Sequence, residues 1–120
     1  MQQDDAADLA CRTAAAFAPD GPLAKAFPGF SARPQQTELA ELVAQAFASD
    51  GTAVAEAGTG VGKTFAYLVP ALLAGGKVLV STGTRTLQDQ LFGRDLPTIA
   101  GALGRRASTA LLKGRANYVC

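Results

Sequence analysis

The sequence predicts an α/β fold in which a parallel sheet is flanked by helices. Three observations support this fold: short apolar runs that suit buried strands, longer stretches with apolar residues at helical spacing, and glycine or proline breaks between them. Strands that alternate with helices favour parallel pairing through right-handed crossovers. A chain of 120 residues suffices for at most one domain with a modest core.

The first half of the chain is predicted to be mainly helical. Residues 4–17 combine acids in the first turn with an apolar face, which is typical of a helix. Residues 18–32 are broken repeatedly by proline and glycine and are predicted to be a connector. Residues 34–49 begin with Pro34, which suits a first helical position, and carry apolar residues at helical spacing until "SDG" ends the helix.

The second half alternates between strand and helix patterns. The helix that begins at Lys63 contains Pro70, which should kink it, and "GG" at 75–76 should end it. The clearest strand is "KVLVST", and Pro97 is placed to start a late helix. In order, the pattern predicts strands at 52–57, 77–82 and 108–114, and helices at 63–74, 85–94 and 97–103.

Composition favours a soluble globular chain. Apolar residues make up 48% and charged residues 18%. No apolar run approaches the roughly 18 residues of a membrane span, and the acidic N-terminus lacks the features of a signal peptide. We therefore expect the protein in the cytoplasm, with Cys11 and Cys120 as thiols unless a metal binds one of them.

Charge is distributed unevenly along the chain. The first 60 residues carry three basic and eight acidic side chains, whereas the last 60 carry eight basic and two acidic ones. A basic second half would attract the phosphates of a nucleotide or of a nucleic acid, although a solvated basic face would look the same in the sequence.

A glycine-rich loop between a predicted strand and a predicted helix indicates a phosphate-binding P-loop. Its glycines allow backbone N–H groups to converge on a phosphate, and the helix that follows adds N–H donors and a positive dipole end. The lysine would contact the β- and γ-phosphates, and the threonine hydroxyl would bind Mg²⁺. The loop consists of Ala57, Gly58, Thr59, Gly60, Val61, Gly62, Lys63 and Thr64.

The loop fits G-x-x-x-x-G-K-[ST] with alanine in place of the first glycine. The dinucleotide pattern G-x-G-x-x-G fails, because Lys63 stands where its third glycine should be. A flexible turn with an incidental lysine is the alternative, and the flanking strand and helix argue against it. The sequence therefore predicts binding of a purine nucleoside triphosphate with Mg²⁺.

Four segments, in this order and spacing, resemble the start of the bacterial DinG/YoaA-type helicases, an iron–sulfur, XPD-like group within superfamily 2. The resemblance covers about Phe30 to Cys120, and residues 1–29 carry no part of it. It implies a RecA-like motor domain beginning near residue 30, an N-terminal extension before it, and the start of an iron–sulfur region at 115–120. The segments are "RPQQTELAELVAQAF", "VAEAGTGVGKTFAYLVPAL", "VLVSTGTRTLQDQL" and "LLKGRANYVC".

The resemblance assigns adenine recognition to a glutamine of "RPQQ". Gln36 is the first choice and Gln35 the second. A side-chain amide offers a donor and an acceptor to the N6/N7 edge of adenine, which would select ATP over GTP. Two exposed helix glutamines are the alternative.

"STGTRTLQDQL" resembles the segment that contacts single-stranded DNA in these helicases. The resemblance implies that Ser81, Thr82, Thr84 and Gln88 hydrogen-bond the DNA backbone, which positions the strand without reading its sequence. Without the family, hydroxyls at this point would more often cap a helix.

Cys120 matches the first of four cysteines that hold a [4Fe–4S] cluster in this family. The family's D-E-A-H box and second motor domain are not in the sequence, so we expect a fragment of a longer, monomeric helicase that moves 5′ to 3′. This fragment would be inactive alone. The alternatives are a complete small nucleotide-binding or kinase-like protein and a non-catalytic nucleic-acid-binding module.

Overall fold

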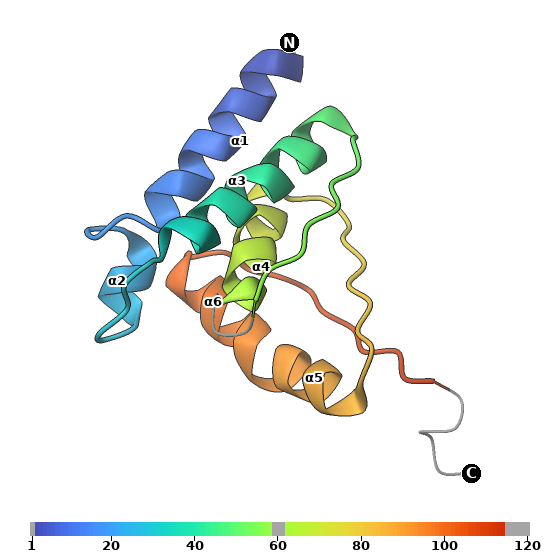
Figure 1. Ribbon diagram of the computed structural model, residues 1–120. Coiled ribbons are helices and arrows are strands. Elements are labelled where there is room, and N and C mark those ends of the chain that lie inside the picture. The colour runs from blue at the N-terminus through green and yellow to red at the C-terminus, as the bar shows by residue number, and fades with distance from the viewer. Residues whose placement is uncertain (1, 59–61, 115–120) are drawn as a thin grey trace.

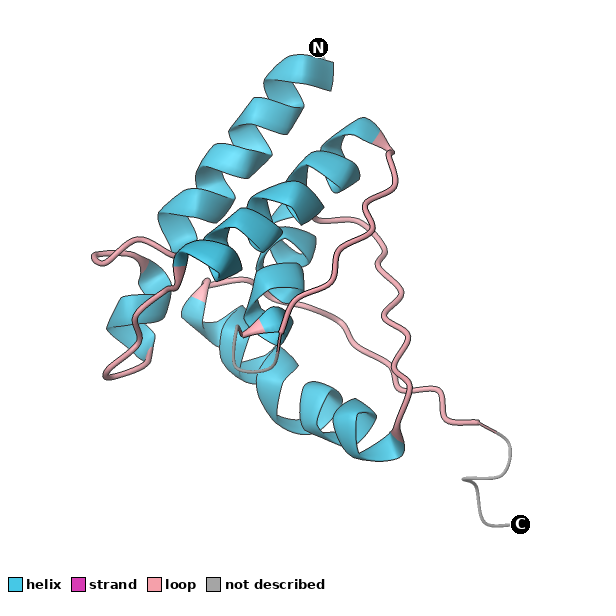
Figure 2. Ribbon diagram, in the orientation of Figure 1, coloured by secondary structure: helices cyan, strands magenta, loops and turns pink. Residues whose placement is uncertain are grey.

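The computed structural model describes residues 2–58 and 62–114, and within them helices are joined by irregular segments (Figures 1 and 2). Three predicted helices are confirmed within two residues of their expected bounds. In chain order the elements are α1 (Gln2–Ala16), α2 (Pro22–Ala26), α3 (Pro34–Ser49), α4 (Lys63–Ala74), α5 (Arg85–Gln90), the π-helical turn η1 (Leu91–Asp95) and α6 (Leu96–Ala102).

The ends of α3 and α4 follow from local sequence. Pro34 occupies the start of α3, and the residue before it is extended, as the proline ring requires. α4 begins directly after Gly62, whose φ is +83°, and ends at Gly75, whose φ is +73°. Both values lie in a region that non-glycine residues rarely adopt. α4 runs on past Pro70 to Ala74.

Two expected segments differ in the structure. The predicted connector contains the short helix α2, which Pro22 initiates. The helices predicted at 85–94 and 97–103 form one helical run, because η1 widens the turn before Pro97. In η1 the Leu96 N–H donates to the Leu91 carbonyl. A wider turn relieves the clash of a proline ring with the preceding turn.

The expected parallel sheet is not present among residues 2–58 and 62–114. Residues 52–57, 77–82 and 108–114 run as irregular segments, without the ladder hydrogen bonds that define strands. Their apolar side chains are open to solvent: Val54 is 93% exposed, Leu79 94% and Leu112 84%. Buried strands need neighbours on both edges and both faces, and these segments lack such neighbours in the described part of the chain.

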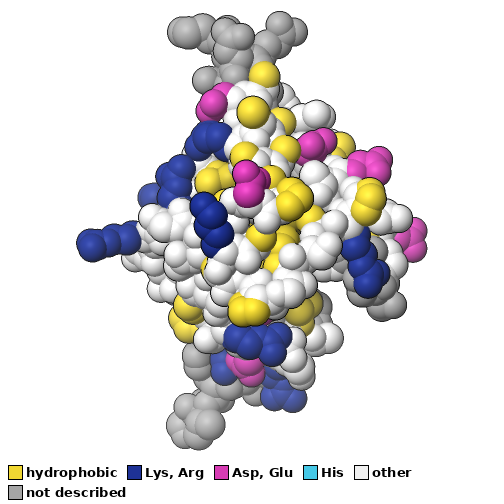
Figure 3. Space-filling model, turned by 90° about the vertical axis from the view of Figure 1, so that its left-hand side faces the viewer, with side chains coloured by type: hydrophobic (Ala, Val, Ile, Leu, Met, Phe, Trp, Pro, Cys, Tyr) yellow, Lys and Arg dark blue, Asp and Glu magenta, His cyan; other side chains and the backbone are white. Residues whose placement is uncertain are grey.

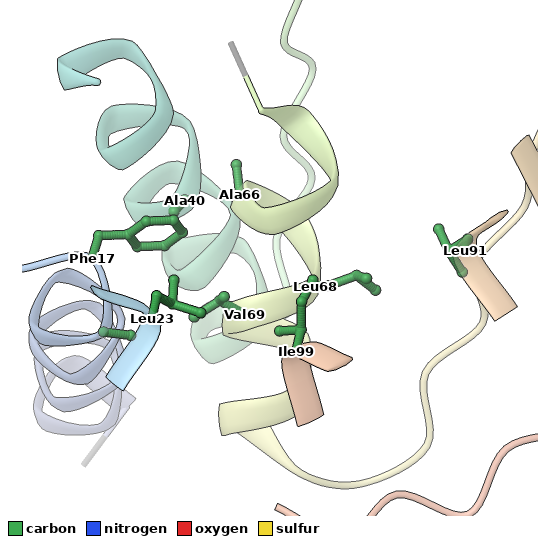
Figure 4. Close-up of a cluster of buried hydrophobic side chains, with 9 residues drawn as sticks. Phe17, Leu23, Ala40, Ala66, Leu68, Val69, Leu91 and Ile99 are labelled. Atoms are coloured by element: carbon green, nitrogen blue, oxygen red, sulfur yellow. The ribbon is translucent and has the colours of Figure 1, made fainter. Parts of the chain in front are cut away.

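The core lies where the helices meet. α3 packs against both α1 and α4, and α6 packs against α2 and α4. Figure 4 shows Phe17, Leu23, Ala40 and Val69 directed toward one another from four parts of the chain. Leu23, Ala40 and Val69 are fully buried. The first 29 residues therefore share one core with α3 and α4.

Aromatic rings join the segment around α2 to the start of α4. Phe27 meets Phe65 edge to face, with 5.4 Å between ring centroids, and Phe30 lies 5.8 Å from the same ring. Such pairs add to the burial of apolar area. Because Phe65 is two residues after Lys63, these contacts anchor the first turn of α4.

The face on the α1 and α2 side carries basic and acidic side chains around a central strip of apolar ones (Figure 3). Among the residues that the structure describes, none of the helices is long and apolar enough to cross a membrane. Cys11 is an exposed free thiol on α1.

Candidate nucleotide and nucleic-acid site

The last residue of the glycine loop and the first turn of α4 form a site suited to phosphate. Gly62 is the N-cap of α4, no side chain of the described residues caps this helix end, and its first turn contains no acid. Lys63 is exposed and Thr64 is half-buried at the same end. Backbone N–H donors, an ammonium and a hydroxyl are a donor set that fits a Mg²⁺–nucleotide. Thr59, Gly60 and Val61 lie outside the described residues.

Gln36 connects α3 to this turn. Its Nε2 donates to the Gly62 carbonyl at 3.1 Å, and the side chain is 5% exposed. A Cβ added at Gly62 would collide with this amide nitrogen. Glycine is favoured at position 62 by its positive φ, and an added Cβ would also move the end of the Gln36 side chain. The sequence predicts Gln36 at a nucleotide site, and in the structure Gln36 is a buried contact of the loop's last glycine, Gly62.

Gln35 has different surroundings from Gln36. It lines a cavity of about 510 Å³ between α3 and the segment that leads into the loop, together with Ala57 and Gly58. Glu38, Glu41 and Glu56 line the same cavity. Three carboxylates disfavour phosphate groups there, so the start of α4 is the better place for a polyphosphate.

Tyr67 belongs to the same site but was not among the residues that the sequence singled out. It is half-buried on α4, three residues after Thr64. Burial raises the pKa of Tyr67 above its usual 10.0, the Thr64 side chain lowers it, and the charge of Asp95 raises it. The signal in the sequence was the three-residue spacing from Thr64, which places both side chains on one helix face.

The residues expected to bind DNA surround a second cavity. This cavity has a volume of about 340 Å³ and is lined by Ser81, Thr82, Thr84 and Gln88. Leu112, from a later part of the chain, lines it as well. Arg85 also lines this cavity and adds a positive charge. The segment after α4 and residues up to Gly114 thus meet around one hollow, although they are far apart in the sequence.

Most of these polar side chains have partners within the protein. Thr84 caps α5, since its Oγ1 accepts the Leu87 N–H at 3.2 Å. The Thr82 hydroxyl donates to the Thr84 carbonyl at 3.4 Å, and Gln88 Nε2 donates to the Leu112 carbonyl at 3.0 Å. Thr84 therefore caps a helix, which is the alternative that its sequence position favoured without the family resemblance. Gln88 ties α5 to the segment at 108–114, where Lys113 pairs with Asp89 at 3.6 Å.

Cys120, the proposed first cluster ligand, lies outside the described residues. Within residues 2–58 and 62–114, no three histidine, cysteine or acidic side chains form a group that could hold a metal ion.

A comparison with protein families matches residues 33–116 to the model for the DEAD/DEAH box helicases. This range includes the glycine loop, Gln36 and the residues around the second cavity. The chain belongs to the DEAD/DEAH box helicase family. Membership implies the P-loop, RecA-like fold of this family.

Curated relatives agree with the DEAD/DEAH assignment. The chain is 58% identical to the ATP-dependent DNA helicase YoaA of Escherichia coli over 104 residues, covering 87% of this chain and 16% of that protein. It is 48% identical to the ATP-dependent helicase DinG of Mycobacterium tuberculosis, covering 77% of this chain and 15% of the relative. It is 37% identical to the 3′-5′ exonuclease DinG of Bacillus subtilis, covering 82% of this chain and 11% of that protein.

The resemblance to DinG/YoaA-type helicases is therefore confirmed, with one correction. A match to 87% of the chain is longer than the stretch from Phe30 to Cys120, so it reaches into the first 29 residues. The packing of α1 and α2 against α3, α4 and α6 agrees with this. The chain spans about one sixth of the length of these YoaA and DinG relatives. No solved structure matches the chain significantly.

Proposed function

We propose that this chain is the ATP-binding part of an ATP-dependent DNA helicase. The observation that carries the proposal is the start of α4, where Gly62, Lys63 and Thr64 stand at a helix end that no described side chain caps. A helix end of this kind offers free N–H donors and a partial positive charge to a phosphate. Family membership and relatives named ATP-dependent helicases support the same activity.

Each residue of the site has a distinct role in this proposal. The Lys63 ammonium stabilises the negative charge of the β- and γ-phosphates, and the Thr64 hydroxyl is an oxygen ligand for Mg²⁺. Bound Mg²⁺ would neutralise phosphate charge during transfer to water. Gln36 selects adenine while its Nε2 holds the Gly62 carbonyl, so a single side chain contacts both base and loop. Gln35 is the second candidate for contact with the base.

Single-stranded DNA is proposed to bind at the 340 Å³ cavity lined by Ser81, Thr82, Thr84 and Gln88. Hydroxyl and amide groups there can donate to phosphate oxygens, and Arg85 adds charge attraction. The excess of basic residues in the second half of the chain supports this placement.

The remaining features of the proposal concern the longer protein. Segments 52–57, 77–82 and 108–114 would pair as parallel strands, which would cover the exposed Val54, Leu79 and Leu112. Cys120 would supply one of four thiolates of a [4Fe–4S] cluster. We further propose a cytoplasmic monomer that moves 5′ to 3′ on DNA.

The test compares two lysine variants of the full-length protein. Lys63→Ala should weaken ATP binding at least about tenfold, equivalent to about 1.4 kcal/mol, and abolish DNA-stimulated ATP hydrolysis. Lys77→Ala is the matched control, because Lys77 is also exposed but follows α4 instead of preceding it. Equal ATP affinity of Lys63→Ala and wild type by calorimetry would refute the nucleotide site. ATP hydrolysis without any response to single-stranded DNA would favour a kinase-like protein.

A further inference from the structure

The first turn of α4 needs support from outside the helix. The helical hydrogen bonding begins where the Ala66 N–H donates to the Gly62 carbonyl at 3.2 Å, and the N–H groups before it take no part in intrahelical bonds. No described side chain caps this end, and a glycine precedes it. Helix ends with few local bonds open readily. The orientation of the turn that carries Lys63 and Thr64 therefore depends on side-chain packing.

Phe65 connects this turn to the segment around α2. Phe27, the C-cap of α2, meets the Phe65 ring edge to face with 5.4 Å between ring centroids, and Phe30 lies 5.8 Å from the same ring. Both distances fall within the range of favourable aromatic pairs. Lys63 and Thr64 directly precede Phe65, so a shift of this ring would move the helix end that they occupy.

The two partner rings are attached to the helical core. The Phe27 N–H donates to the Leu23 carbonyl at 2.9 Å, and the Phe30 N–H donates to the Phe27 carbonyl at 3.0 Å. Leu23 is fully buried, and the Phe30 ring also lies 6.3 Å from the ring of Phe17. Figure 4 shows Phe17 and Leu23 in one buried cluster with side chains of α4. The rings that contact Phe65 are thus fixed by α1 and α2.

We propose that Phe27 and Phe30 are positioning residues that hold the phosphate-binding end of α4 in place through the ring of Phe65. This inference rests on the proposed ATP site. In this role neither phenylalanine contacts a phosphate, because each acts through Phe65. The first turn of α4 is proposed to contact phosphates, whereas Gln36 is proposed to contact the base. Loss of one ring contact should therefore weaken the binding of ATP and spare the binding of adenosine.

The experiment measures two affinities of the full-length protein, for a fluorescent ATP analogue with Mg²⁺ and for adenosine as its competitor. Phe27→Leu keeps an apolar side chain and removes the ring that meets Phe65. The dissociation constant of the ATP analogue should rise about twofold to tenfold, the range for one aromatic pair, while that of adenosine stays unchanged. An unchanged affinity for the ATP analogue would overturn the inference, and so would an equal loss for adenosine.

A control variant separates positioning from a general loss of stability. Ile99→Val in α6 removes one methyl group from the same buried core and leaves the ring contacts of Phe65 intact. It should lower the thermal midpoint without changing either affinity. If Ile99→Val weakens binding of the ATP analogue as much as Phe27→Leu does, the phenylalanines only stabilise the fold and the inference is wrong.

A double-mutant cycle tests whether the effect passes through Phe65. Adding Phe27→Leu to Phe65→Leu should raise the dissociation constant of the ATP analogue by a smaller factor than Phe27→Leu does in the wild type, because the shared contact is already lost. Phe30→Leu should behave in the same way, since its ring packs on Phe65 too. Equal factors in both backgrounds would contradict the mechanism.

Failure of the inference can be told apart from failure of the nucleotide site. If the wild type binds the ATP analogue and Lys63→Ala does not, the site stands whatever Phe27→Leu does. If wild type and Lys63→Ala bind the analogue equally, the site itself is wrong and the inference falls with it.

Discussion

Gly62→Ala should destabilise the junction between α3 and α4 by two separate effects. An alanine at a φ of +83° takes a left-handed conformation that costs about 1–2 kcal/mol. Its Cβ would also displace the Gln36 amide from the Gly62 carbonyl. Leaving a buried amide without its partner costs about 1–3 kcal/mol more. Together the loss is about 2–5 kcal/mol.

Hydrogen exchange of the α3 and α4 amides measures this loss in the full-length protein. A loss of about 2 kcal/mol corresponds to about 30-fold faster exchange through local opening, and larger losses give more. Gly58→Ala is the matched control in the same loop, because a Cβ there meets no atom of the described residues within 4 Å. Its effect should stay below about 0.5 kcal/mol.

The two causes can also be separated. Gln36→Ala in the Gly62→Ala background removes the collision and leaves only the backbone cost, so part of the protection should return. Unchanged exchange in Gly62→Ala would refute the reasoning. Equal acceleration in Gly62→Ala and Gly58→Ala would show that the loop as a whole, and not the contact with Gln36, determines the effect.

Three further changes test other contacts. Arg12→Ala removes a hydrogen bond to the Leu73 carbonyl at the end of α4 as well as the ion pair with Asp8. Denaturant unfolding should therefore show a loss of up to about 1.5 kcal/mol in the free energy of unfolding. Asp8→Ala removes only the exposed ion pair and should cost about 0–1 kcal/mol. The Thr13 hydroxyl is buried without a hydrogen-bond partner among the described residues. Thr13→Val should therefore leave the free energy of unfolding unchanged or raise it by up to about 1 kcal/mol. A clear loss of stability in Thr13→Val would contradict this prediction. Burial raises the pKa of Tyr67, so the contribution of this side chain to stability is present below pH 10 and is lost as pH rises through the folded-state pKa. The difference in free energy of unfolding between wild type and Tyr67→Phe, measured in urea, should therefore shrink above roughly pH 10. A difference that stays constant with pH would refute this prediction.

The helices were predictable because their signals are local. Pro34 fixes the start of α3, and the glycines at 62 and 75 bound α4, so both helices have the expected limits. Gln36 was identified from family resemblance and does lie at the loop. Its hydrogen bond to the Gly62 carbonyl was not predictable, because it joins two residues that are 26 apart in the sequence and that the packing of α3 against α4 brings together.

The strands were predicted from apolar runs, and the runs alone do not make a sheet. A strand gains its hydrogen bonds and its burial from other segments, so its formation depends on contacts that sequence pattern does not specify. Leu79 shows this clearly, since it sits in the clearest strand pattern of the chain yet is 94% exposed. Thr84, by contrast, does what its local sequence predicts, because it caps α5, and it is also proposed to contact DNA.

The proposed phosphate-binding turn is contacted by helices on both sides, and this has a consequence for how the site forms. α3 reaches Gly62 through Gln36, while Phe27 and Phe30 pack on Phe65 in the first turn of α4. Gly62 and the first turn of α4 are therefore held by helix packing, without strand pairing among the residues that the structure describes. Ala57 and Gly58, at the end of the segment proposed to become a strand, would depend on a sheet for their position. Nucleotide contacts to Lys63 and Thr64 should thus be less sensitive to changes in the strands than contacts to Ala57 and Gly58.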